Sequence, residues 1–113
     1  MSEVKGKVIL LSAEGCGSND DLGLEILANL LEALANREDR PVAIALWNTA
    51  VNLVVTGSPL LPSLRNLEQK GVKILAGKSC LVDLELEDKV AVGKIATMTE
   101  ILDLLLHNDV VSL

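Results

Sequence analysis

Short apolar runs alternate with helix-like patterns along the chain. A nearly unbroken apolar centre bounded by polar or glycine-containing turns is typical of a strand buried on both faces of a sheet. Such runs predict strands at residues 7–12, 41–47 and 72–76, and a short fourth strand at 90–95. Residues 110–113 form either a frayed tail or a small edge strand.

Leucines at helical spacing predict helices between these strands. The first helix has its apolar stripe at Leu22, Ile26, Leu27, Leu30, Leu31 and Leu34, with Asn19, Asp20 and Asp21 available as caps. The two prolines in residues 48–71 argue against one continuous helix there. A helix can instead begin with Ser58 as its cap and Pro59 in its first turn, bury Leu60, Leu64 and Leu67, and end at Gly71.

The last third of the chain predicts two further helices. A short one lies within residues 79–87, before the fourth strand. Thr97 and Glu100 have the spacing of a capping box, which begins a last helix that ends near His107. The position of His107 is explained by the helix dipole, which favours a cation at that end.

Strands and helices that alternate in this order predict an α/β fold. We expect one domain spanning residues 1–113, a three-layer α/β/α sandwich with a mainly parallel sheet of four to five strands. Ligands and reactive groups in such sheets gather beyond the carboxyl ends of the strands. That rule selects three turns, residues 13–21, 47–50 and 77–80, and the first and last of them each hold a cysteine.

Composition narrows the classes of partner. The net charge is −6, with 10 Lys+Arg against 16 Asp+Glu, which disfavours nucleic acid as a partner. No apolar run approaches the roughly 20 residues of a membrane span, and residues 1–7 lack a signal-peptide core, so we expect a cytoplasmic protein that binds no membrane. One histidine and two cysteines outside any Cys-x-x-Cys pair predict neither a metal site nor a cofactor.

Two nucleotide-binding motifs are incomplete. Gly77-Lys78-Ser79 matches the end of a P-loop, but Gly71 is one residue too distant to be its first glycine, and the residues between form the predicted strand. Gly15 and Gly17 stand between a strand and a helix as in a dinucleotide fingerprint, but Asp20 occupies the place of the third glycine. A tight turn with a helix cap explains the second pattern better.

Cys80 is the main candidate for chemistry. It follows a strand at the expected start of a helical turn, where free backbone amides favour a thiolate, and Lys78 adds a positive charge nearby. A buried structural cysteine explains it equally well. Cys16, between two glycines, is either a second reactive thiol or a small residue in a tight turn, and Asn48 either caps a helix or binds a ligand.

The last helix carries more apolar residues than one buried face requires. The residues are Ile101, Leu102, Leu104, Leu105 and Leu106. Because the chain is small and rich in aliphatic residues, part of this surface is expected to contact another subunit. We therefore expect a homo-oligomer: a dimer, trimer or hexamer.

The complete pattern resembles the DsrE/DsrF-like sulfur-relay superfamily, most closely the carboxy-terminal domain of YedF-type sulfurtransferase-like selenium metabolism proteins. The similar segments are KVILLSAEGCGSNDDLG, ALWNTAVNLVVTGSPLLPSLRNLEQKGVKILAGKSCLVDLEL and VAVGKIATMTEILDLLL. The order of these pieces carries the resemblance, and no single piece does so alone.

The resemblance implies a DsrE-like fold, assembly into dimers or rings, and a cysteine after the third strand that carries sulfur as a persulfide. That role falls on Cys80, with backbone amides around Gly77 and Ser79 as donors to the sulfur. YedF-like turns read Cys-Gly-Thr-Cys-Leu, whereas this chain has Gly77 in place of the first cysteine. Chemistry with two thiols within this turn is therefore excluded. The one other cysteine, Cys16, lies in the turn at residues 13–21 and is the candidate to replace the missing thiol.

Two hypotheses follow from the sequence. In the first, Cys80 relays a persulfide between partner proteins, and Gly15, Cys16, Gly17, Asn48, Gly77, Lys78 and Ser79 surround the substrate. The amino-terminal TusA-like domain usual in YedF proteins is not in this sequence, so a TusA-like carrier or a cysteine desulfurase would be a separate chain. In the second, the protein is a non-catalytic structural or interaction subunit, or a small-ligand binder.

Overall fold

Five parallel strands form one sheet in the order β4-β3-β2-β1-β5. The structure is a computed structural model, and it describes residues 6–113. The strands are β1 (Lys7–Leu11), β2 (Ala43–Leu46), β3 (Lys73–Gly77), β4 (Lys94–Ala96) and β5 (Asp109–Ser112). All four strand pairs are parallel, so the sheet is fully parallel. The carboxyl ends of the strands consequently lie at one edge of the sheet.

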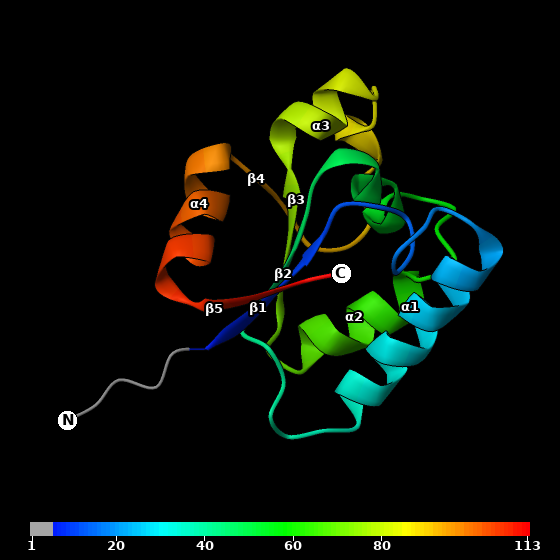
Figure 1. Ribbon diagram of the computed structural model, residues 1–113. Helices are drawn as coiled ribbons and strands as arrows, with labels where there is room; N and C mark the ends of the chain where they lie inside the picture. The colour runs from blue at the N-terminus through cyan, green and yellow to red at the C-terminus, as the bar shows by residue number, and fades with distance from the viewer. Residues whose placement is uncertain (1–5) are drawn as a thin grey trace.

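Helices cover both faces of the sheet, which makes the fold a three-layer α/β/α sandwich (Figure 1). The described residues form four α-helices, α1 (Asp21–Ala35), α2 (Leu61–Gln69), α3 (Lys78–Asp83) and α4 (Met98–His107). They also form two short 3₁₀ helices, η1 (Asn48–Val54) and η2 (Glu87–Lys89). Helices α1 and α2 lie together on one face, α4 lies on the other, and α3 follows the carboxyl end of β3.

The core has two unequal parts, one on each side of the sheet. The larger cluster joins Leu11, Ile44 and Ile74 of the strands to leucines of α1 and α2 and to apolar residues of η1. The smaller cluster packs Ile101 of α4 against alternate strand residues such as Val8. Side chains on neighbouring positions of a strand point to opposite faces, so each buried strand contributes to both clusters. The aliphatic runs of the sequence are explained by this burial on two sides.

Several element boundaries follow the sequence signals. Asp20 caps α1 by accepting a hydrogen bond from the Gly23 amide at 2.8 Å. Thr97 and Glu100 form the predicted capping box of α4. Gly71, with φ +94°, ends the α2 region as expected. Local chemistry therefore determines these ends.

Other boundaries differ from the prediction. Leu22 and Ile26 are 65% and 47% exposed, because α1 packs through Leu27 and Leu31 instead. Helix α2 begins at Leu61, two residues after Pro59, because the Ser58 hydroxyl accepts a hydrogen bond from the Leu60 amide in a turn that precedes the helix.

The fourth strand is also shorter than predicted. It covers only Lys94–Ala96, because Gly93 turns the chain at φ +77°. Val90 instead makes an isolated antiparallel bridge with Val55. Residues 109–112 form an edge strand beside β1, which decides between the two alternatives left open for the end of the chain.

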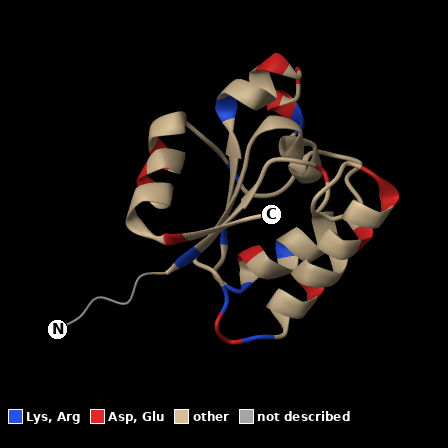
Figure 2. Ribbon diagram, viewed as in Figure 1, with Lys and Arg blue, Asp and Glu red and all other residues tan. Residues whose placement is uncertain are grey.

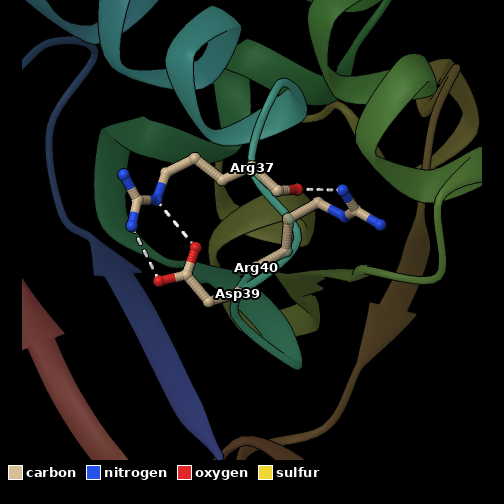
Figure 3. Close-up of polar contacts among 3 residues, drawn as sticks. All are labelled: Arg37, Asp39 and Arg40. Carbon is tan, nitrogen blue, oxygen red and sulfur yellow. Dashed lines mark hydrogen bonds and ion pairs between the residues drawn. The ribbon is translucent and has the colours of Figure 1, made fainter.

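The loop from α1 to β2 holds a surface ion pair (Figure 3). Arg37 contacts Asp39 through Nε and Nη2 at 2.7 and 2.8 Å, and Arg40 donates a hydrogen bond to the Arg37 carbonyl oxygen. The paired side chains are 62% and 70% exposed, so the pair fixes the shape of the loop more than it stabilises the fold. This loop lies at the amino ends of the strands, away from the three turns at the carboxyl edge.

Candidate functional site around Cys80

Cys80 lies in the first turn of α3, directly after β3. Its side chain is partly buried against the larger core cluster. It lines a pocket of about 340 Å³ together with Asn48, Ser79, Asp83 and Leu84. The pocket is at the carboxyl edge of the sheet, where a doubly covered parallel sheet binds its ligands.

The Cys80 sulfur accepts a hydrogen bond from the chain that follows β2. The backbone amide of Asn48 lies 3.0 Å from Cys80 Sγ. Asn48 is the first residue of η1, and the first amides of a helix have no partner within the helix. The donor to the thiol sulfur is therefore a residue from the neighbouring strand end, in addition to the backbone around Gly77 and Ser79 that the resemblance implies as donors to a bound sulfur.

Asn48 has an unusual backbone conformation. Its φ is +55°, a left-handed value that asparagine tolerates better than most residues. Such conformations are retained where the surrounding structure requires them, and they concentrate at functional sites. Here the turn directs the amide of Asn48 to the sulfur, and the exposed side chain of Asn48 lines the pocket.

Gly77 is the last residue of β3 and precedes the first residue of α3. No loop separates this strand from this helix, so there is no backbone cradle for phosphates and the P-loop interpretation fails. A Cβ built at Gly77 would lie 3.7 Å from Cys80 Sγ and 3.6 Å from Trp47 Cβ, which are ordinary contacts. The fold therefore has room for a Cβ atom at the position where YedF-like proteins have their first cysteine.

Lys78 and Ser79 occupy the first turn of α3, and both are exposed. Ser79 lines the Cys80 pocket, whereas Lys78 does not. Trp47 directly follows β2 and packs against the smaller core cluster. Its indole N–H donates a hydrogen bond to Ser12 Oγ at 3.0 Å, which ties the ends of β1 and β2 together.

The turn with Gly15, Cys16 and Gly17 is a separate structure at the same sheet edge. The Cys16 amide donates to the Gly23 carbonyl oxygen at 2.9 Å, and a Cβ at Gly15 would lie 2.5 Å from the Ser18 carbonyl oxygen. Burial raises the pKa of the Cys16 thiol. None of the three residues lines the Cys80 pocket. This turn therefore packs closely against the start of α1 and is hydrogen-bonded to it.

One acidic side chain of α3 lines the pocket, and three more follow it in the sequence. Asp83 lines the pocket, and Glu85, Glu87 and Asp88 border a neighbouring hollow (Figure 2). No sequence motif marks Asp83 or Leu84, because their place beside the thiol depends on the turn of α3. Within residues 6–113 no group of His, Cys, Asp and Glu side chains is arranged to hold a metal ion.

A larger hollow of about 590 Å³ lies away from Cys80. It opens between α4 and the starts of β3 and β4, and its walls include Lys73, Lys94, Asp103 and His107. It contains no cysteine and lies at the amino ends of the strands, where this fold class does not collect ligands. The smaller pocket with Cys80 is therefore the better candidate for chemistry.

Similarity to known proteins is detectable in the fold and not in the sequence. No protein-family profile and no curated protein sequence matches the chain. Among residues 6–113, no helix has the length and apolar character needed to cross a membrane.

Solved structures share the fold over almost the whole chain. The ychN protein from E. coli is 18% identical and has a TM-score of 0.68, over 96% of this chain and 99% of that one. MTH1491 from Methanobacterium thermoautotrophicum is 15% identical, with a TM-score of 0.70 over the same shares of the two chains. BT1422 from Bacteroides thetaiotaomicron is 20% identical, with a TM-score of 0.71 over 96% of this chain and 95% of that one. The last two are described as proteins of unknown function, so these likenesses establish a YchN/DsrE-like fold and no activity.

Proposed function

We propose that this protein is a single-thiol sulfur carrier that holds sulfur as a persulfide on Cys80. The observation that carries the proposal is the hydrogen bond from the Asn48 amide to Cys80 Sγ at 3.0 Å, within a pocket at the carboxyl edge of the sheet. A neutral thiol is a weak acceptor, so an amide directed at sulfur suits an anionic sulfur better. The YchN/DsrE-like fold is compatible with this role.

The transfer needs no cofactor. The Cys80 thiolate attacks the outer sulfur of a donor persulfide, a new S–S bond forms at Cys80, and the donor S–S bond breaks to release the donor thiolate. The proton on the outer sulfur stays with it. An acceptor thiolate then attacks that sulfur and releases Cys80, so sulfane sulfur moves without net oxidation or reduction.

We also propose that the protein is of the YedF type, which the sequence resembles most closely. Because position 77 is glycine, the turn that holds Cys80 has a single thiol. Cys16 lies in a separate turn that is hydrogen-bonded to Gly23 of α1. In this proposal the sulfur on Cys80 passes to another molecule instead of forming an internal disulfide. A TusA-like carrier or a cysteine desulfurase in the cytoplasm is the proposed class of partner.

Mass spectrometry tests the proposal directly. After incubation with glutathione persulfide, the intact mass of the wild type and of Cys16→Ser should rise by one sulfur atom, and the mass of Cys80→Ser should not. Dithiothreitol should reverse the gain. Equal loading of Cys80→Ser, or no loading of the wild type while a known carrier loads, would contradict the proposal.

A non-catalytic role is the alternative, and the partial burial of Cys80 against the core favours it. A structural thiol reacts slowly with a charged alkylating reagent until the protein unfolds. In a Cys16→Ser background, slow native alkylation followed by fast alkylation in urea supports this alternative. Fast native alkylation supports the carrier.

A further inference from the structure

Hydrogen bonds that involve side chains join the carboxyl ends of three neighbouring strands. Strands β1, β2 and β3 lie side by side in the sheet (Figure 1). Ser12 directly follows β1 and Trp47 directly follows β2, whereas Cys80 lies in the first turn of α3, after β3. The Trp47 indole N–H donates to Ser12 Oγ at 3.0 Å. The next residue, Asn48, donates its amide to Cys80 Sγ at 3.0 Å, so these contacts connect Ser12 to the thiol through two consecutive residues.

Trp47 is held by both its backbone and its side chain. Its backbone amide donates to the Leu11 carbonyl oxygen at 3.1 Å, and its carbonyl oxygen accepts from the Ala50 amide at 3.2 Å. The second of these bonds lies at the start of a 3₁₀ helix, a type with poorer hydrogen-bond geometry than an α-helix. The side chain packs against the smaller core cluster and is bonded to Ser12. The anchored side chain therefore adds to the constraint on the peptide between Trp47 and Asn48.

The peptide between Trp47 and Asn48 needs such a constraint. Asn48 has a φ of +55°, which costs energy for a residue with a Cβ and persists only where the surrounding structure requires it. A rotation of this peptide would relieve the strain and turn the Asn48 amide away from the sulfur. Because a thiol is a weak acceptor, the bond to Cys80 is not sufficient to prevent that rotation.

We propose that Ser12 and Trp47 are positioning residues for Cys80. Their hydrogen bond fixes the peptide between Trp47 and Asn48 and thereby keeps the Asn48 amide directed at the sulfur. Neither Ser12 nor Trp47 lines the Cys80 pocket, so both act through Asn48. A donor at the sulfur stabilises the thiolate, which is the attacking form of a cysteine. The proposal rests on the proposed function only in taking Cys80 as the reacting thiol.

Amide hydrogen exchange measured by NMR tests the positioning directly. In Ser12→Ala the Asn48 amide should exchange about two- to tenfold faster, the factor that one net hydrogen bond represents. Ser12→Thr keeps the hydroxyl and should restore the wild-type exchange rate. Ser58→Ala is the matched control, because Ser58 Oγ accepts a hydrogen bond from the Leu60 amide at 3.2 Å and does not line the Cys80 pocket. It should speed the exchange of Leu60 and leave that of Asn48 unchanged.

Alkylation of Cys80 measures the consequence for the thiol. In a Cys16→Ser background at neutral pH, iodoacetamide should modify Cys80 about two- to tenfold more slowly in Ser12→Ala. Trp47→Phe keeps an aromatic ring, loses the N–H and should slow the reaction by the same factor. The double variant should be no slower than either single variant, because both changes remove the same hydrogen bond. Ser12→Thr and Ser58→Ala should react at the wild-type rate.

Three outcomes would overturn the proposal. They are unchanged exchange of the Asn48 amide in a folded Ser12→Ala protein, additive effects of Ser12→Ala and Trp47→Phe on the alkylation rate, and equal slowing of that rate by Ser58→Ala. If Ser12→Ala fails to fold, Trp47→Phe decides through the same two measurements.

Sulfur loading separates this proposal from the proposed function. A wild type that takes up no sulfur from glutathione persulfide, while exchange and alkylation still depend on Ser12, would refute the carrier and support the positioning role. A Ser12→Ala protein that loads Cys80 at the wild-type rate with unchanged exchange of Asn48 would support the carrier and refute the positioning role.

Discussion

Asn48 connects backbone conformation to chemistry at the level of one residue. Its φ of +55° orients an amide to Cys80 Sγ, and this amide is present whatever the side chain. Glycine adopts such a φ without steric penalty, whereas alanine loses roughly 1 kcal/mol there. The contribution of the backbone can therefore be separated from that of the side chain.

We expect Asn48→Gly to retain sulfur loading on Cys80, with Asn48→Ala less stable than Asn48→Gly by about 1 kcal/mol. Urea unfolding measures the stability and intact mass measures the loading. A stable Asn48→Gly protein that no longer loads sulfur would show that the amide side chain is required and that the backbone donor is not sufficient.

Gly77 offers the converse experiment, in which a thiol is added. Its φ of −63° suits any residue, and a Cβ added there would meet only ordinary contacts of 3.6 Å or more. Gly77→Cys should fold normally and, with oxidised glutathione, form a disulfide with Cys80, because a Cβ at this position is 3.7 Å from the sulfur. The intact mass should fall by two hydrogens. Gly77→Ser is the control, and three free thiols after oxidation would contradict the geometry.

Elements whose ends depend on local chemistry were predictable from the sequence. The capping box of α4 and the glycine end of α2 each need only residues within one turn. The 3₁₀ helix η1 was not predictable, because its buried residues Ala50 and Val51 are held by tertiary packing. Likewise, the sequence cannot distinguish Leu22 from Leu27 on α1, since only the position of α2 decides which leucine is buried.

Gly93 determines where β4 begins, and it gives a prediction at the scale of the element. It has φ +77°, and a Cβ there would lie 2.5 Å from the Ile74 carbonyl oxygen of β3. Gly93→Ala should lose about 2–4 kcal/mol in urea unfolding, because strain and overlap with backbone add. Gly57→Ala, at φ +91° with no neighbour within 4 Å, should lose only about 1 kcal/mol. Equal losses would contradict a role for close packing between β3 and β4.

At the scale of the molecule, the alternation of strands and helices was sufficient to predict a doubly covered parallel sheet. It also identified the carboxyl edge, and with it the turn that holds Cys80. It could not reveal that Asn48 contacts the sulfur, because this contact joins two segments that are 32 residues apart in the sequence. Asp83 and Leu84 line the pocket because α3 places them one turn beyond Cys80. Because Asp83 lines the pocket, its charge should affect the reactivity of the Cys80 thiol.

The acidic rim should make Cys80 discriminate against anionic reagents. In a Cys16→Ser background, the ratio of the iodoacetate rate to the iodoacetamide rate should be lower for Cys80 than for glutathione, because Asp83 and a net charge of −6 repel the anion. Added salt should raise the ratio by screening. Asp83→Asn should raise it about two- to fivefold at low salt, as expected for one charge a few ångströms away.

Asp103→Asn is the control, because it removes one charge from the α4 side of the molecule without touching the Cys80 pocket. If Asp83→Asn and Asp103→Asn raise the ratio of the two alkylation rates equally, the net charge of the molecule determines that ratio, and the position of Asp83 does not. A ratio equal to that of glutathione at low salt would show that the rim does not act on the thiol. If only Asp83→Asn raises the ratio, a partner that brings sulfur to Cys80 needs a neutral or cationic surface.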